Sequence, residues 1–158
     1  MTHATPLPGL PAYAELQCLS NFSFLQGASH PKELVAQAAQ LGYAAIAITD
    51  ECSLAGVVRA LAEAEKHEIS LIIGSTLRLE AAPFASDAPP LSLVLLAQTR
   101  EGYGNLSELI TLGRSRSEKG HYQLYRDDIS APRAPYAHLR NMPECLAILA
   151  PLHGTPAE

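Results

Sequence analysis

One segment constrains the fold more than any other. Residues Tyr43 to Thr49 (YAAIAIT) form a nearly continuous apolar run of strand length. Such a run is typical of a strand buried on both faces, as in parallel sheets that helices cover. Helical patterns flank it, since Pro31 suits the first turn of a helix that Gly42 would end, and a second helix is expected from Leu54. The segment therefore predicts an α/β fold.

Strand-like and helix-like segments alternate along most of the chain. Four further apolar runs are expected to be strands: Tyr13–Leu19, Leu71–Leu79, Leu91–Ala97 and Cys145–Ala150. The alternation predicts mostly parallel strands joined by right-handed crossovers. In folds of this kind, functional sites collect at the carboxyl ends of the strands. Candidate functional residues are therefore expected in the loops that follow the strands.

Three helices are expected between these strands. Ser29 and Thr99 are suitable N-caps for the first and the third, which spans Glu101–Leu112. Gly102 and Gly104 weaken the first turn of the third helix. The expected apolar faces are Leu34, Ala38 and Leu41; Val57, Val58 and Leu61; and Leu106, Leu109 and Ile110. From Gly113 to Asn141 the periodicity fades, and basic residues there either contact a phosphate backbone or lie on a solvated loop surface.

Size and composition narrow the class of protein. The 158 residues, 47% of them apolar, suit one globular domain, which we expect at 13–158 after a flexible Pro-rich leader at 1–12. The leader lacks the pattern of a secretory signal and no apolar run is long enough to span a membrane, so a cytoplasmic location is expected. Three cysteines at wide spacing exclude a disulfide framework. A net charge of -5 argues against a self-sufficient nucleic-acid binder.

Two adjacent carboxylates follow the apolar strand directly. Asp50 and Glu51 could bind a hard cation or act in acid/base chemistry. Alternatively, Asp50 caps the next helix through backbone N–H groups. Cys18 and Cys52 could form a redox or soft-metal site, although no nearby His completes a tetrahedral set.

Three blocks, in order, resemble one protein family. They are YAELQCLSNFSFLQGASHPKELVAQAAQLGYAAIAITDECSLAGVVRA at 13–60, REGYGNLSELITLGR at 100–114 and KGHYQLYRDDI at 119–129. Together they resemble the start of the PHP (polymerase and histidinol phosphatase) domain of bacterial family C DNA polymerases, and most closely its error-prone, translesion branch. This resemblance implies a partial PHP-type distorted βα barrel, incomplete on its C-terminal side.

The resemblance also implies where metal ligands would lie. Metal-binding members end their first three strands in His-x-His, Asp-His and Gly-x-Glu. The matching positions here hold Gln17 and Leu19, Asp50 and Glu51, and Thr76. Asp50 alone keeps its ligand, so the resemblance implies no metal cluster and no catalytic residue. A weak Mg²⁺ or Mn²⁺ site built on the two carboxylates remains an alternative.

The implied function is that of an N-terminal PHP module in an error-prone DNA polymerase used in damage-induced mutagenesis and translesion synthesis. With its cluster degenerate, the module would be a scaffold without a cofactor. Its implied partners are the rest of the polymerase chain, DNA through the parent polymerase, and mutagenesis accessory proteins. Two alternatives stay open: a stand-alone interaction module, and a small metal-dependent phosphoesterase using Asp50 and Glu51, with Cys18, Cys52 or His30.

Overall fold

The computed structural model describes residues 12–81 and 89–150. The expected leader at 1–12 lies outside the described residues, except for its last position. The chain divides into two compact units, Met1–Ser75 and Thr76–Glu158, and strand β3 (Ser70–Leu79) runs from the first into the second. The order of the strands in the sheet is β1-β2-β3-β4-β5.

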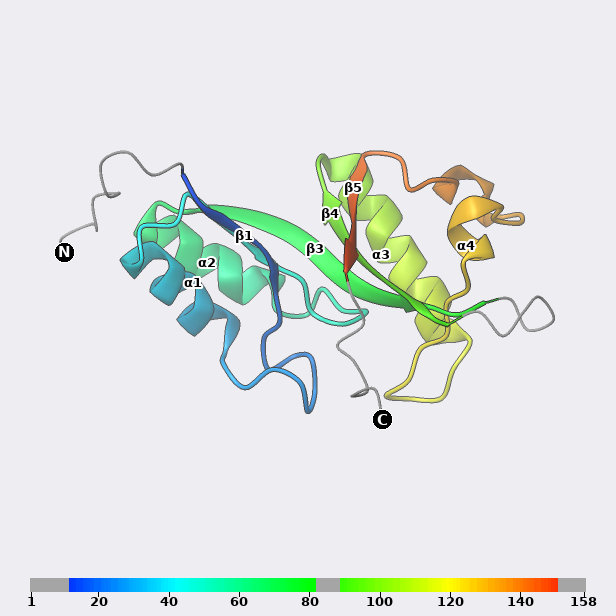
Figure 1. The fold of residues 1–158 in the computed structure, drawn as a ribbon, viewed down its shortest axis with the longest axis horizontal. Coiled ribbons are helices and arrows are strands. Elements are labelled where there is room, and N and C mark those ends of the chain that lie inside the picture. Colours follow the sequence, from blue (N-terminus) through cyan, green and yellow to red (C-terminus); the bar gives the residue numbers. More distant parts are fainter. Residues whose placement is uncertain (1–11, 82–88, 151–158) are drawn as a thin grey trace. The chain divides into compact units, whose positions relative to one another are not determined.

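The first unit is a parallel sheet with two helices, as the alternation predicts. It contains β1 (Ala14–Cys18), α1 (Pro31–Gln40), β2 (Ala45–Ile48), α2 (Val57–His67) and the first part of β3. Strand β2 lies in the centre, with β1 and β3 both parallel to it. Figure 1 shows α1 and α2 beside these strands. Most residues of its hydrophobic core come from the two helices and from β2, and they include Val35, Ala38, Ile46, Ile48, Ala60 and Ala64.

The faces of α1 and α2 differ from the expected ones. Val58 and Leu61 are 77% and 45% exposed, so their prediction as buried residues is wrong. Val57, Ala60 and Ala64 form the buried face instead, because their spacing of three and four residues aligns them and alanine lets α2 pack closely against α1. In α1 the buried residues are Pro31, Val35 and Ala38, while the expected Leu41 is the exposed C-cap. The N-cap is His30 rather than Ser29.

The second unit pairs its strands in the opposite sense. It contains the rest of β3, then β4 (Leu91–Ala97), α3 (Arg100–Ser115), α4 (Asp127–Ser130), the 3₁₀ helix η1 (Tyr136–Leu139) and β5 (Cys145–Ala150). Strands β4 and β5 are antiparallel, and their pairing runs from Ser92 opposite Ala150 to Ala97 opposite Cys145. The alternation of strands and helices does not indicate this pairing. The α/β class itself is confirmed.

Helix α3 begins as the sequence indicates. Thr99 is its N-cap, and the Thr99 side chain accepts a hydrogen bond of 3.2 Å from the backbone N–H of Gly102. Gly102 is needed there, because a Cβ at this position would lie 2.0 Å from the backbone oxygen of Glu144. Close approach of the backbone segment before β5 thus explains a glycine that weakens the helix locally. None of the described helices is long and apolar enough to cross a membrane.

Candidate functional site

A buried polar cluster lies in the first unit where β1 and β2 end. Its centre is the carboxylate of Asp50, which is 1% exposed. One carboxylate oxygen, Oδ1, accepts hydrogen bonds of 2.7 Å from the backbone N–H of Ser20 and from the hydroxyl of Ser23. The other, Oδ2, accepts one of 2.7 Å from the hydroxyl of Ser20. Asp50 therefore holds the segment after β1 against the end of β2.

The segment held by Asp50 is a tight loop, 20–27. The backbone N–H of Ser23 donates to the carbonyl of Ser20, and the N–H groups of Gln26 and Gly27 both donate to the carbonyl of Ser23 at 3.0 Å. Gly27 closes the loop, since a Cβ there would lie 2.1 Å from the carbonyl oxygen of Ser20. The N–H of Asn21 reaches the carbonyl of Ser29, just before α1. The loop is thus fixed by backbone bonds as well as by Asp50.

The end of β2 is joined to the same loop and to β3. The backbone N–H of Glu51 donates to the Ser23 hydroxyl at 2.9 Å, and the Gln26 amide donates to the Glu51 carboxylate. The Ser75 hydroxyl donates a hydrogen bond of 2.7 Å to the carbonyl of Asp50 and accepts one from the N–H of Ser53. Serine hydroxyls both donate and accept, which lets Ser23 and Ser75 link the end of β2 to the loop after β1 and to β3.

This geometry limits what Asp50 can do chemically. Both of its oxygens are aimed at N–H and O–H donors, so its negative charge is stabilised by hydrogen bonds within the fold. Gly56, at the start of α2, leaves little space beside it, because a Cβ at Gly56 would lie 3.1 Å from Oδ2. The N-cap of α2 is Gly56, so the alternative that Asp50 caps this helix is wrong.

Three of the other predicted ligand positions, Gln17, Leu19 and Thr76, hold uncharged side chains. Gln17 is exposed on β1, and Leu19 is half-buried and has no donor atom. Thr76 lies on β3 with its hydroxyl oxygen buried and without a hydrogen-bond partner. Among residues 12–81 and 89–150, no group of three or more His, Cys, Asp and Glu side chains is placed to hold a metal ion. With Leu19 and Thr76 at two of the matching positions, the side chains differ from the ligand set that the resemblance implies.

The alternative ligands Cys18, Cys52 and His30 also lie in the first unit. Cys52 is buried, and Cys18 is half-buried with its backbone N–H bonded to Thr49 Oγ1 at 3.0 Å. Burial, together with the negative charges of Glu15 and Asp50, raises the pKa of the Cys18 thiol to about 11. The thiolate is the nucleophilic form of cysteine, so this raised pKa makes Cys18 a weak nucleophile at neutral pH. His30 Nδ1 is 2.9 Å from the side-chain nitrogen of Asn21 at the start of α1.

Sequence reasoning missed the serines of this cluster. Ser20 and Ser23 are completely or almost completely buried, with 0% and 2% exposure. Their signal in the sequence is a Ser-x-x-Ser spacing directly after one strand, opposite an Asp directly after the next. Strand ends that meet at one edge of a parallel sheet bring such residues together.

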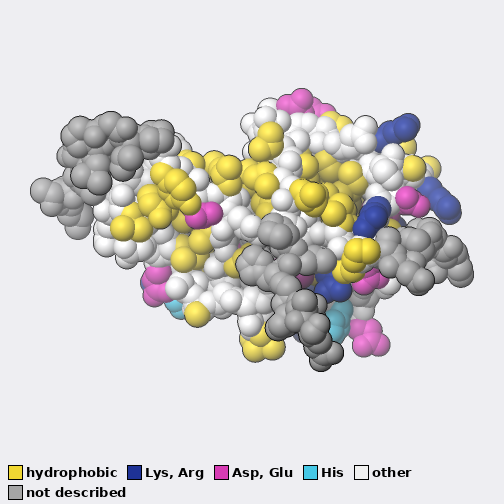
Figure 2. All heavy atoms as spheres, viewed as in Figure 1, with side chains coloured by type: hydrophobic (Ala, Val, Ile, Leu, Met, Phe, Trp, Pro, Cys, Tyr) yellow, Lys and Arg dark blue, Asp and Glu magenta, His cyan; other side chains and the backbone are white. Residues whose placement is uncertain are grey.

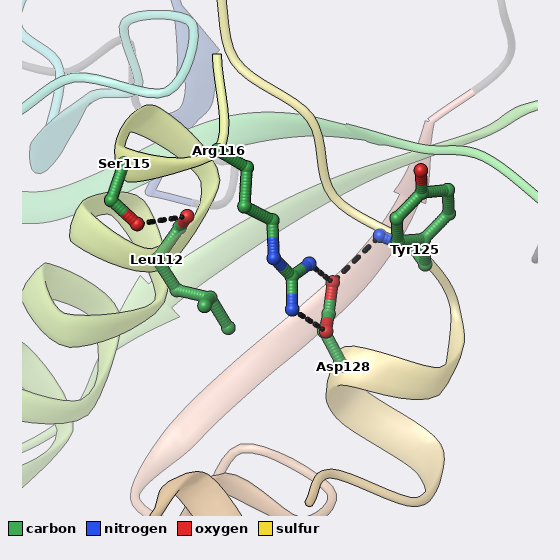
Figure 3. Close-up of polar contacts among 5 residues, drawn as sticks. All are labelled: Leu112, Ser115, Arg116, Tyr125 and Asp128. Atoms are coloured by element: carbon green, nitrogen blue, oxygen red, sulfur yellow. Dashed lines mark hydrogen bonds and ion pairs between the residues drawn. The ribbon is translucent and has the colours of Figure 1, made fainter.

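A second polar cluster lies in the second unit. The guanidinium of Arg116 makes a bidentate contact with Asp128, at 2.6 and 2.9 Å, and Figure 3 shows the two groups facing each other. The Tyr125 N–H donates to the same carboxylate at 2.8 Å, and the Tyr125 ring lies 5.7 Å from the guanidinium. The hydrogen bonds that Arg116 donates to Asp128 raise the pKa of Arg116. Arg116 is exposed at the end of α3, and through Asp128 it joins α3 to α4.

A cavity of about 620 Å³ adjoins this ion pair. Besides Arg116 and Asp128, its lining includes Leu112 of α3, the exposed Arg133 and the ring of Tyr136. The residues named above as expected metal ligands do not line this cavity. The guanidinium of Arg116 and the carboxylate of Asp128 neutralise each other, so this ion pair is a structural contact at the cavity wall.

Comparison with known proteins gives one consistent family. The model of the PHP domain matches residues 15–155. The chain is 66% identical over 149 residues to the error-prone DNA polymerase of Bordetella parapertussis and 58% identical over 151 residues to that of Ralstonia pickettii. These matches cover 94% and 96% of this chain, but the chain spans only 14% of the length of each relative.

Solved structures show the same fold at low sequence identity. An amidohydrolase from Chromobacterium violaceum matches 66% of this chain and 34% of its own length, with a TM-score of 0.53 at 22% identity. A proposed metal-dependent phosphoesterase from Bifidobacterium adolescentis matches the same shares, with a TM-score of 0.52 at 23% identity. The predicted partial barrel of this fold type is confirmed by these likenesses, which concern the fold alone.

Proposed function

The chain belongs to the PHP domain family, and from this premise we propose that it is the N-terminal module of an error-prone DNA polymerase, in which it serves as a structural scaffold. Nucleotidyl transfer, DNA contact and any binding of mutagenesis accessory proteins would depend on the rest of that polymerase chain. The process served would be damage-induced mutagenesis and translesion synthesis, within DNA replication and repair in the cytoplasm. High identity to error-prone polymerases over nearly the whole chain supports this assignment.

The state of Asp50 is the observation that carries the scaffold role. Asp50 is the one position where the family's ligand is kept, and its carboxylate is turned to Ser20 and Ser23 inside the fold. A carboxylate that activates water through a metal must offer a lone pair to the ion and carry charged neighbours around it. Leu19 and Thr76 offer no charge at the matching positions. We propose that Asp50 stabilises the domain and that no resident cofactor acts here.

Metal content and hydrolysis test the scaffold role directly. The chelator-treated protein is analysed for bound metal and assayed for phosphodiester hydrolysis in added Mn²⁺, Zn²⁺ or Mg²⁺. We expect no stoichiometric metal and background hydrolysis, unchanged in Asp50→Asn. About one bound metal per chain, with turnover that Asp50→Asn abolishes but Glu65→Gln keeps, would replace the scaffold by the phosphoesterase alternative.

Deletion within the parent tests the assignment to a polymerase. We expect that removing the region equivalent to this chain from the full-length polymerase shortens the half-life of primer-extension activity on warming several-fold. The physical reason is that the polymerase core loses the module that packs against its surface. A deletion that leaves both activity and half-life unchanged would contradict the scaffold role.

A further inference from the structure

The loop between β1 and α1 ends in an apolar tip that consists of Phe24 and Leu25. Their exposed fractions are 82% and 91%, so both side chains are almost fully in solvent. Figure 1 shows this loop, in blue, extending away from β1 and α1, and Figure 2 shows hydrophobic side chains gathered at its end. Two adjacent large apolar side chains at such exposure mark a contact surface more often than scattered single residues do.

The apolar tip is held in place rather than free to move. Leu25 has a backbone φ of +63°, a left-handed conformation that costs a leucine free energy. The neighbours compensate, since the carbonyl of Ser23 binds the N–H groups of Gln26 and Gly27 on the far side of the tip. The Ser23 hydroxyl is bonded to Asp50 beneath it. A strained residue persists only where its surroundings determine its conformation, and such places cluster at functional contacts.

We propose that the apolar tip docks into an apolar pocket on a later part of the same polymerase polypeptide. This inference rests on the proposed function. It also assigns a role to the buried cluster: Asp50, together with Ser20 and Ser23, presents Phe24 and Leu25 in one orientation. A pre-oriented tip loses little conformational entropy when it docks, which is the general advantage of preorganisation.

The small size of the apolar tip favours a docking pocket on the same polypeptide over one on a separate protein. Burial of two side chains yields less free energy than a separate protein loses in translational and rotational freedom on association. A covalently joined partner has already lost most of that freedom, and its effective concentration is high. The relatives supply such a partner, because this chain spans only 14% of their length. The small apolar tip can therefore bind a surface that belongs to the same polypeptide, although it would bind a separate protein only weakly.

Photo-crosslinking in the full-length polymerase tests the docking. Benzoylphenylalanine replaces Phe24, and in a matched control it replaces Val58, which is 77% exposed on α2 of the same unit. We expect position 24 to crosslink within the polypeptide to one apolar segment beyond the PHP region, and position 58 not to reach that segment. Crosslinks confined to the PHP region, crosslinked dimers, or the absence of any crosslink at position 24 would each overturn the proposal.

Serine variants give a second readout that keeps the two proposals apart. In the full-length polymerase, Phe24→Ser with Leu25→Ser is expected to shorten the half-life of primer-extension activity on warming at least five-fold relative to Val58→Ser. If the double variant has the same half-life as the control while deletion of the whole region shortens it, the docking of the apolar tip is overturned and the scaffold role stands. If the deletion also has no effect, both proposals fail.

Discussion

Replacement of Asp50 by alanine should strongly destabilise the first unit. The carboxylate is 1% exposed and accepts hydrogen bonds of 2.7 Å from the Ser20 N–H, the Ser20 hydroxyl and the Ser23 hydroxyl. Asp50→Ala leaves these donors buried beside an apolar methyl group. Each buried polar group that loses its partner costs about 1–3 kcal/mol, although rotating serine hydroxyls recover part of it. We therefore expect a loss of about 3–5 kcal/mol, a large share of the roughly 5–15 kcal/mol typical of a domain.

Asp50→Asn separates the effect of charge from that of shape. The amide oxygen can still accept from the Ser20 N–H and the Ser23 hydroxyl, and the amide nitrogen can donate to the Ser20 hydroxyl oxygen. The expected cost is only about 1–2 kcal/mol, because charge-assisted hydrogen bonds become neutral ones. Glu65→Gln on α2 is the control, since it removes the same charge from an exposed side chain.

Urea unfolding measures these differences. Far-UV circular dichroism follows the whole chain, and near-UV dichroism follows the edge-to-face pair of Tyr13 and Tyr43, whose ring centres are 4.6 Å apart in the first unit. We expect the order of stability Glu65→Gln, then Asp50→Asn, then Asp50→Ala. If Asp50→Ala lies within about 0.5 kcal/mol of the control, the usual range for surface substitutions, the reasoning about the buried carboxylate is refuted.

Three further predictions concern other parts of the fold. With its pKa raised to about 11, Cys18 should be alkylated by iodoacetamide far more slowly at pH 8 than a free cysteine, and faster as the pH rises toward 11. By linkage, the contribution of the protonated thiol to stability is complete below the unfolded pKa of 9.0 and is lost as the pH rises from 9.0 to about 11. The difference in unfolding free energy between wild type and Cys18→Ala should therefore change between pH 8 and pH 11, and an equal difference at both pH values would contradict the linkage. In a double-mutant cycle, Arg116→Met and Asp128→Asn should show a coupling of about 1–2 kcal/mol, whereas additive effects would show that the bidentate contact contributes nothing. Ile48→Ala should cost about 2–5 kcal/mol, because the side chain is 2% exposed in β2, and an unchanged melting temperature would refute its place in the core.

The elements of secondary structure were largely predictable. The run at β2 is apolar on both faces and predicts a buried central strand, which the parallel pairing with β1 and β3 confirms. Pro31 lies in the first turn of α1, and Gly42 follows the helix with a φ of +74°. Thr99 caps α3 through its side chain. These features depend on residues near one another in the sequence, so local propensity and periodicity suffice to find them.

The faces that become buried were less predictable. Val58 and Leu61 are more apolar than Ala60 and Ala64, yet the alanines are buried and the larger side chains are exposed. Which stripe of α2 faces inward depends on how closely α1 can approach, and small side chains allow the closer contact. Composition along one helix does not contain that information. The antiparallel pairing of β4 with β5 is likewise set by partners some 50 residues apart in the sequence.

What the sequence by itself determined is the α/β class, the positions of the strands and the resemblance to the PHP family, which implies that most of the family's metal ligands are replaced. What only the tertiary structure decided is the use of the ligand that remains. Asp50 contacts Ser20 and Ser23, which are 30 and 27 positions away in the sequence. A carboxylate at a strand end can bind a cation, cap a helix or anchor a loop, and its residue type is the same in each case. The donors that the fold brings within 2.7 Å select the third use, because a buried charge must be satisfied by its actual neighbours.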